Sequence, residues 1–316
     1  MSRAMSVEPS YLRLYSQGLL TERIEKALAL LKPCRLCPRA CGVDRLKGET
    51  GFCETGRKAA VASAAAHFGE ESPLVGRFGS GTIFIRSCNL LCRFCQNHEI
   101  SHGKEGTEVG PEGLAALMVT LGRAGCHNIN FVTPTHVVPQ ILEALPLAIE
   151  SGLRVPLVYN SGGYDSRDTL ELLEGIFDLY MPDFKFWDNR WAERYCAAPD
   201  YREVACAAVR EMHRQVGDLA LDERGIARTG LLVRHLVMPN RIAGTEEVME
   251  FVAREIAVNT YVNVMDQYRP CGSAHGDEFI NRRLYAKEYR DAVSAAKRAG
   301  LARLDERERP RLIVMP

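Results

Sequence analysis

Residues 79–99, GSGTIFIRSCNLLCRFCQNHE, decide how the rest of the chain is interpreted. A Gly-Ser-Gly turn precedes the β-branched and apolar run 82–87, which is typical of a short buried strand. Three cysteines follow with the spacing C-x3-C-x2-C: Cys88, Cys92 and Cys95. A cubane [4Fe–4S] cluster normally takes four cysteines, so three in one short loop would leave one iron open to a substrate or cofactor. The spacing therefore favours a catalytic metal centre over a structural one.

This motif, with the aromatic Phe94 before its last cysteine and a strand before its first, resembles the radical S-adenosylmethionine (radical SAM) superfamily. The chain is similar to relatives of pyruvate formate-lyase activating enzyme, in a branch with an N-terminal CxxCPRxC segment. The resemblance implies that Cys88, Cys92 and Cys95 each bind one iron of a [4Fe–4S] cluster, and that S-adenosylmethionine chelates the fourth iron. It also implies reductive cleavage of S-adenosylmethionine to a 5′-deoxyadenosyl radical, which abstracts hydrogen.

Two other interpretations of the three cysteines stay open at this point. Together with His98 they form a ligand set that zinc accepts. Free cysteine is also commonly buried as a small hydrophobic residue, so thiols without any metal would be compatible with the same sequence. The agreement between the spacing, the preceding strand and the rest of the chain favours the cluster.

A second group of cysteines lies upstream, in a loop punctuated by glycine and proline: Cys34, Cys37, Cys41 and Cys53. Four thiols at these spacings predict a second metal site. Tetrahedral zinc and an auxiliary [4Fe–4S] cluster fit the ligands equally well. Extra clusters are common among relatives of activating enzymes, which slightly favours iron and sulfur. Basic residues of this loop, including Arg39 and Arg45, are expected to form a solvated face.

Composition narrows the class of protein. Among 316 residues, 40 basic and 40 acidic side chains cancel, which argues against a non-specific binder of nucleic acid or of membrane surfaces. Eleven cysteines, with no apolar secretory segment at the N-terminus, indicate a reducing compartment. The chain has no run of about 18 apolar residues, so no membrane span is expected. A cytoplasmic location is predicted, with neither membrane nor nucleic acid as an expected partner.

Strands and helices alternate after the three-cysteine loop. The expected strands cover 82–87, 128–133, 156–160, 176–185, 230–238 and 260–266. The expected helices cover 8–31, 111–124, 137–151, 167–175, 187–216, 244–257 and 285–299. Such alternation predicts an α/β fold with a parallel sheet. Six units match the partial (β/α)6 radical SAM barrel that the resemblance implies. Three parts are expected: an N-terminal helix and cysteine-rich metal-binding module (1–78), the barrel (79–305) and a C-terminal tail (306–316).

Polar residues stand at the ends of the predicted strands, where β/α barrels carry their reactive groups. The second strand ends in Thr133-Pro134-Thr135-His136, whereas the family commonly has a glycine-rich GGE-type turn there for the amino group of S-adenosylmethionine. A threonine would have to replace that turn. Lys185 or Arg234 would suit the carboxylate of S-adenosylmethionine. The resemblance thus implies a cofactor site that contains Thr133, Thr135, Asn160, Asp183, Lys185 and Arg234.

The same residues have plainer explanations. Asp183 and Lys185, two apart on one strand, would face the same side and could form a simple ion pair. Arg234 could pair with a neighbouring acid. Three further cysteines in predicted helices are expected only to pack: Cys126, Cys196 and Cys206. No residue is assigned a catalytic role.

The resemblance implies an enzyme that generates a glycyl radical on a partner protein, with a flavodoxin- or ferredoxin-type electron donor. Because fold does not determine substrate, a radical enzyme that modifies a small molecule, a peptide or RNA stays open. A zinc-binding scaffold module and a plain electron carrier are alternatives from other classes. The polar strand ends count against both.

Overall fold

The computed structural model describes residues 8–305, and the predicted C-terminal tail at 306–316 lies outside them. Nine strands form one mixed sheet in this described part, with the order β3-β1-β2-β4-β5-β6-β8 and with β7 and β9 both paired to β8. Six neighbouring strands are parallel and follow one another in chain order: β2 (Ser80–Ile85), β4 (Ile129–Val132), β5 (Leu157–Ser161), β6 (Leu179–Pro182), β8 (Ala227–Leu236) and β9 (Tyr261–Met265). The predicted α/β class and its parallel strands are confirmed.

Three antiparallel strands were not predicted: β1 (Ala59–His67), β3 (Thr107–Val109) and β7 (Ala220–Leu221). The sequence of β1, AAVASAAAH, is rich in alanine, which favours helix and is depleted in strands. The other two strands are too short to show alternation. β1 pairs antiparallel with β2, from His67 opposite Ser80 to Val61 opposite Ile85. The main sheet therefore begins within the segment 1–78.

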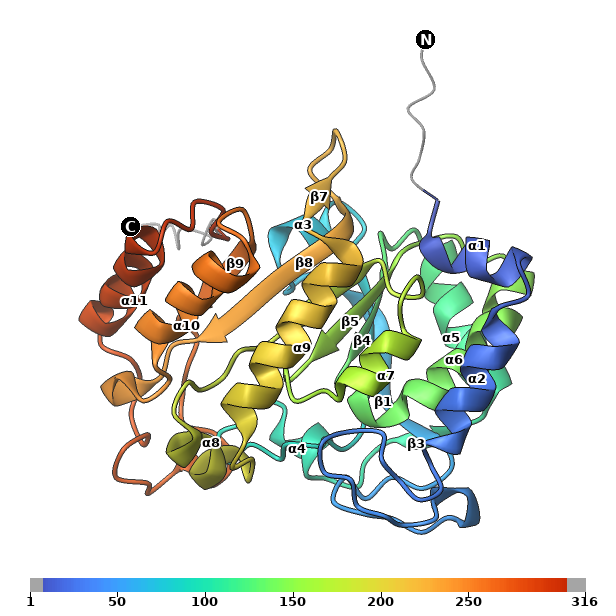
Figure 1. Ribbon diagram of the computed structural model, residues 1–316, viewed down its shortest axis with the longest axis horizontal. Coiled ribbons are helices and arrows are strands. Elements are labelled where there is room, and N and C mark those ends of the chain that lie inside the picture. Colours follow the sequence, from blue (N-terminus) through green and yellow to red (C-terminus); the bar gives the residue numbers. More distant parts are fainter. Residues whose placement is uncertain (1–7, 306–316) are drawn as a thin grey trace, which may run out of the picture.

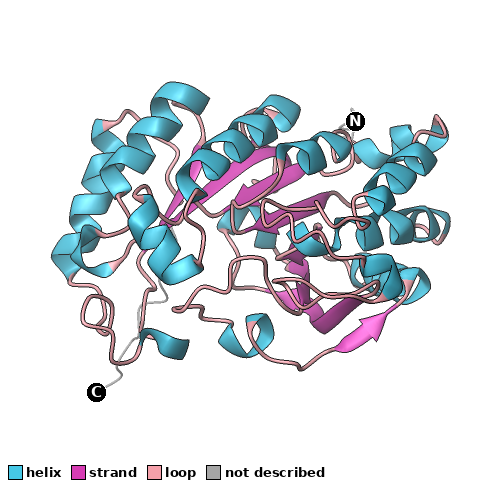
Figure 2. Ribbon diagram, turned by 60° about the horizontal axis from the view of Figure 1, so that its bottom comes forward, coloured by secondary structure: helices cyan, strands magenta, loops and turns pink. Residues whose placement is uncertain are grey.

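Several of the longer helices cover the outer face of the curved sheet, whereas α8 (Asn189–Cys196) lies beyond the carboxyl ends of the strands, as Figure 1 shows; Figure 2 gives a second view. The helices are α1 (Ser10–Ser16), α2 (Leu20–Ala29), α5 (Pro111–Arg123), α6 (Val138–Glu150), α7 (Arg167–Leu172), α8, α9 (Tyr201–Val216), α10 (Thr245–Phe251), the π-helical turn η4 (Val252–Ile256) and α11 (Ala286–Arg298). The predicted helices 8–31 and 187–216 are each split in two. Gly18, with φ of 72°, separates the first pair, and Ala197, with φ of 51°, separates the second. Between residues 8 and 305, no helix has the length and apolar character needed to cross a membrane.

Side chains of the parallel strands alternate between two faces. Those facing the helices, such as Phe131 and Tyr159, belong to the large core. On the other face Val158, Met181 and Leu232 pack around Leu74 of the short helix α3 (Ser72–Val75). Leu74 lies in the connection between β1 and β2, so this connection covers the inner face of the sheet. Polar groups occupy the same face closer to the carboxyl ends of the strands.

Candidate functional site

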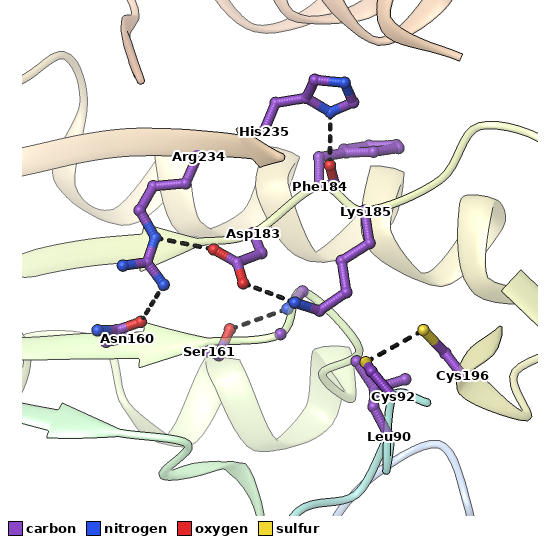
Figure 3. A network of polar contacts seen from close by, with 12 residues as sticks. Leu90, Cys92, Asn160, Ser161, Asp183, Phe184, Lys185, Cys196, Arg234 and His235 are labelled. Carbon is purple, nitrogen blue, oxygen red and sulfur yellow. Dashed lines mark hydrogen bonds and ion pairs between the residues drawn. The ribbon is translucent and has the colours of Figure 1, made fainter. Parts of the chain in front are cut away.

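Three predicted site residues meet because of the register of the sheet. Asn160 of β5 lies opposite Met181 of β6. Asp183 follows Met181 by two residues, so its side chain points to the same face of the sheet. Asp183 in turn forms a parallel bridge with Arg234 of β8. Arg234 Nε donates to Asp183 Oδ1 at 2.8 Å, and Arg234 Nη2 donates to Asn160 Oδ1 at 2.7 Å (Figure 3). Residues from three strands thus form one polar network.

Lys185 is the second cation of this network. Its Nζ donates to Asp183 Oδ2 at 2.6 Å, so one carboxylate serves both cations. Burial alone would raise the pKa of Asp183, but Arg234 and Lys185 outweigh burial and hold that pKa below its usual value. Burial alone would likewise lower the pKa of Lys185, but Asp183 keeps it well above the usual value. Both predicted ion pairs are therefore present, and they share Asp183.

Arg234 is also surrounded by acidic side chains from the connection between β1 and β2. Its Nη1 lies 3.7 Å from Glu70 Oε2 and 3.9 Å from Glu71 Oε1. Glu71 is fully buried and accepts a hydrogen bond of 2.7 Å from Asn263 Nδ2, a residue in register with Arg234. The sequence analysis missed Glu71 and Asn263. The three neighbouring carboxyl groups of Asp183, Glu70 and Glu71 therefore neutralise the positive charge of Arg234 within the protein.

The three-cysteine loop faces this network across the inner side of the sheet. Burial raises the pKa of Cys88 to about 12 and raises the pKa of Cys95 as well. The contact with the Cys196 thiol, together with burial, raises the pKa of Cys92 because both favour its neutral form. The positive charge of Lys185 acts in the opposite direction on the pKa of Cys92 and of Cys95. Its side chain lies between Asp183 and the part of the loop that carries Leu90 and Cys92 (Figure 3). In the metal-free protein these thiols are neutral, so metal binding must displace their protons.

The loop itself is held by packing and by backbone bonds. Phe94, the aromatic residue of the motif, packs between Phe186 and Tyr268 with ring centroids 5.8 and 6.2 Å away. Arg93 N–H donates to the carbonyl oxygen of Tyr195 in α8 at 2.9 Å. His98, the alternative zinc ligand, begins the short helix α4 (His98–Ser101) and stacks on His102 with ring centroids 4.1 Å apart. Its ring is thus engaged with another imidazole.

The two predicted threonines differ in their surroundings. The backbone N–H of Thr133 donates to Asn160 O at 2.8 Å, so Thr133 borders the polar network. Thr135 lies apart, because its buried hydroxyl donates to Asp165 Oδ1 at 2.7 Å. Asp165 also accepts hydrogen bonds from Tyr159 at 2.9 Å and from Ser161 at 2.6 Å. This buried cluster fixes the turn that follows β5.

The four upstream cysteines converge on a second site. Together they line one small pocket: Cys34, Cys37, Cys41 and Cys53. Burial, with a smaller contribution from the other three thiols, raises the pKa of Cys37 to about 12. The residue types and their convergence fit a thiolate metal centre, for zinc and for an iron–sulfur cluster alike. In the part of the chain that the structure describes, no group of three or more His, Cys, Asp or Glu side chains is placed to hold a single metal ion.

Two basic residues of this loop, one buried and one half-buried, are engaged with the protein, contrary to the solvated face expected from sequence. Arg45 is only 1% exposed, and its Nε and Nη2 donate to Gly56 O at 3.1 and 3.0 Å. Arg39 Nε donates to Asn89 O at 2.8 Å, and its guanidinium lies 3.9 Å from the centre of the Phe52 ring. Buried carbonyl groups require donors, and a guanidinium offers five. Arg39 thereby joins the four-cysteine loop to the three-cysteine loop, and both lie on the same side of the sheet (Figure 1).

Gly51 is a close-packed point of the four-cysteine loop. A Cβ atom there would lie 2.6 Å from Cys41 Cβ and 2.7 Å from Cys41 Sγ. We expect Gly51→Ala to displace the Cys41 side chain and lower metal affinity about 10-fold, an effect comparable to loss of an outer-shell contact. The measurement is the metal retained at this site through a graded challenge with a chelator. Gly56→Ala is the matched control, because its Cβ would be 3.5 Å from the nearest atom. Equal retention in the two variants would contradict this assignment.

No protein-family model matches the chain. Its sequence is 32% identical over 294 residues to the uncharacterised protein MJ0674 of Methanocaldococcus jannaschii. The aligned region covers 90% of this chain and 80% of that relative, so the similarity is not confined to a short cysteine motif. The chain therefore belongs to the same protein family as MJ0674.

Proposed function

We propose that the chain is a radical SAM enzyme. The observation that carries this proposal is the position of Lys185, which Asp183 holds in a buried network of opposite charges and which lies next to Leu90 and Cys92 of the three-cysteine loop (Figure 3). Burying charged groups costs free energy, and a loop that only held a structural metal would not need a buried charge network beside it. Buried ionisable groups of this kind are characteristic of functional sites.

The parallel strands support the same proposal. Six strands in chain order, with helices on the outer face, provide the arrangement from which a partial (β/α)6 barrel is built. The three-cysteine loop follows β2, and the polar network lies at the ends of β5, β6 and β8. Active sites of β/α barrels occupy this carboxyl end of the strands. We assign both groups to one active site.

Each residue receives a role from its surroundings. Cys88, Cys92 and Cys95 would hold the [4Fe–4S] cluster, which when reduced supplies the electron that cleaves S-adenosylmethionine. Lys185 suits the carboxylate of that cofactor better than Arg234 does. An ammonium group has three donors, and Asp183 accepts from one of them. The Arg234 guanidinium instead donates to Asp183 and Asn160 and faces two further carboxylates.

Arg234 therefore acts as a positioning residue in this proposal. It holds Asp183, and Asp183 holds Lys185 towards the cysteines. Asn160 and the backbone of Thr133 form the neighbouring wall of the cofactor site, with Thr135 supporting it from the buried cluster around Asp165. As the target of the radical we propose a glycyl residue of a partner protein, which the resemblance to activating enzymes supports.

Metal analysis of anaerobically purified protein tests the proposal. Iron, sulfide and zinc are measured in the wild type and in the triple variant Cys88→Ala/Cys92→Ala/Cys95→Ala. We expect the triple variant to lose about four iron and four sulfide, the content of one cubane cluster. The metal that remains would identify the content of the four-cysteine site. A wild-type protein that carries zinc but no iron would contradict the proposal.

A further inference from the structure

A cysteine outside both cysteine loops lies against the three-cysteine loop. Cys196, the last residue of α8, is fully buried, and its Sγ lies 3.1 Å from Sγ of Cys92, which is 7% exposed. Figure 3 shows the two sulfur atoms facing each other. The contact joins residues 104 positions apart in the sequence. A thiol is both a weak donor and a weak acceptor, so Cys196 S–H can donate to the sulfur of Cys92.

Backbone contacts hold Cys196 in this position. Arg39 Nη2 donates to Cys196 O at 2.9 Å, and Arg39 Nη1 also donates to Ala197 O. The bond from Arg93 N–H to Tyr195 O joins the same end of α8 to the three-cysteine loop. The end of α8 is thus tied to both cysteine loops. Cys196 is presented to Cys92 by a fixed backbone, whereas Cys126 and Cys206 are buried as the sequence predicts for packing residues.

We propose that Cys196 is a positioning residue that tunes the metal centre. It donates its S–H to the Cys92 sulfur and thereby raises the reduction potential of a cluster bound by Cys88, Cys92 and Cys95. This inference rests on the proposed function. Reduction adds negative charge to an iron–sulfur cluster, and hydrogen bonds to its sulfur ligands are among the features that set the potential. The positive charge of Lys185, whose side chain lies between Asp183 and Cys92, acts in the same direction (Figure 3).

The low polarity around the contact strengthens the effect. Cys92, Cys196 and the adjoining aromatic residue Phe94 are all buried, so bulk water does not compete for the Cys92 sulfur. A neutral thiol suits the buried position next to the Cys92 sulfur, because a second cation near Lys185 would cost more free energy to bury. Cys196 therefore supplies a hydrogen bond without adding a charge.

The test is a redox titration that gives the midpoint potential of the cluster in the wild type and in variants at position 196. Electron paramagnetic resonance monitors the reduced form of the cluster. Cys196→Ala removes the donor, and we expect its potential to be more negative than that of the wild type. Cys196→Ser restores a donor, and we expect its potential to lie above that of the alanine variant. Cys206→Ala, the matched control in α9, is expected to keep the wild-type potential. If alanine prevents cluster loading, Cys196→Val fills the space of the thiol without a donor and takes its place.

Iron and sulfide content separate the two ways in which the idea fails. If wild type and the variant without a donor carry the same iron and have the same potential, the role of Cys196 is overturned while the proposed function stands. A lowered potential that serine does not recover would also overturn it, because packing alone would then explain the change. If the wild type binds no iron at the three-cysteine loop, both this inference and the proposed function are overturned.

Discussion

Replacement of Asp183 by asparagine is expected to lower the free energy of unfolding by about 3–5 kcal/mol, because it leaves the buried Lys185 without a carboxylate and Arg234 with only the more distant Glu70 and Glu71. Lys185 Nζ and Arg234 Nε approach Asp183 to 2.6 and 2.8 Å, and all three side chains are only 16–17% exposed. Asparagine keeps the shape of the side chain but offers one acceptor oxygen and no charge. Denaturant unfolding of the metal-free protein measures the change.

Glu22→Gln is the matched control for charge removal. Glu22 pairs with Lys26 at 2.6 Å, but these side chains are 61% and 57% exposed. Exposed pairs on a helix contribute about 0.3–0.5 kcal/mol, so this variant should be nearly as stable as the wild type. If Asp183→Asn costs no more than Glu22→Gln, the strand ends do not enclose a buried charge network, and the description of the site is wrong.

Methionine in place of Lys185 is expected to weaken S-adenosylmethionine binding about 10- to 100-fold. A hydrogen bond to a charged group contributes about 1.5–3 kcal/mol, which corresponds to that range. Methionine keeps an unbranched apolar stem, and Asp183 stays paired with Arg234, so the fold should be preserved. Calorimetric titration of the cluster-loaded protein with S-adenosylmethionine measures the affinity.

Two further variants make this result specific. Lys185→Arg retains the positive charge and should recover part of the affinity, although its planar fork differs from an ammonium group. Arg234→Gln should lower stability through Asp183, Glu70 and Glu71, with a smaller effect on affinity than Lys185→Met. Unchanged affinity in Lys185→Met together with loss of affinity in Arg234→Gln would assign the cofactor carboxylate to Arg234 instead.

The strands that carry the site could be predicted because their sequence is simple. Short apolar runs bounded by glycine, proline and polar residues indicated all six parallel strands, and each of these strands is present. In a parallel sheet whose strands follow chain order, residues near the carboxyl ends of neighbouring strands meet at one edge. This position alone predicts that Asn160, Asp183 and Arg234 come together. This local regularity explains why the network could be anticipated residue by residue.

Contacts between distant parts of the chain could not be anticipated in the same way. β1 was hidden by its alanine content, because its strand conformation depends on pairing with β2. Cys196 has no local feature that distinguishes it from Cys126 or Cys206, and its contact with Cys92 depends on how α8 packs. Arg39 was expected to be solvated, since no local pattern reveals the carbonyl groups that it reaches.

The most direct test of radical SAM chemistry is the cleavage of S-adenosylmethionine. Anaerobic, iron-loaded wild-type protein is reduced with dithionite and supplied with S-adenosylmethionine, and 5′-deoxyadenosine is quantified by chromatography. We predict 5′-deoxyadenosine from the reduced wild type, none without dithionite, and none from Cys88→Ala/Cys92→Ala/Cys95→Ala. Reduced wild-type protein that carries its cluster yet forms no more 5′-deoxyadenosine than the triple variant would contradict the proposed function.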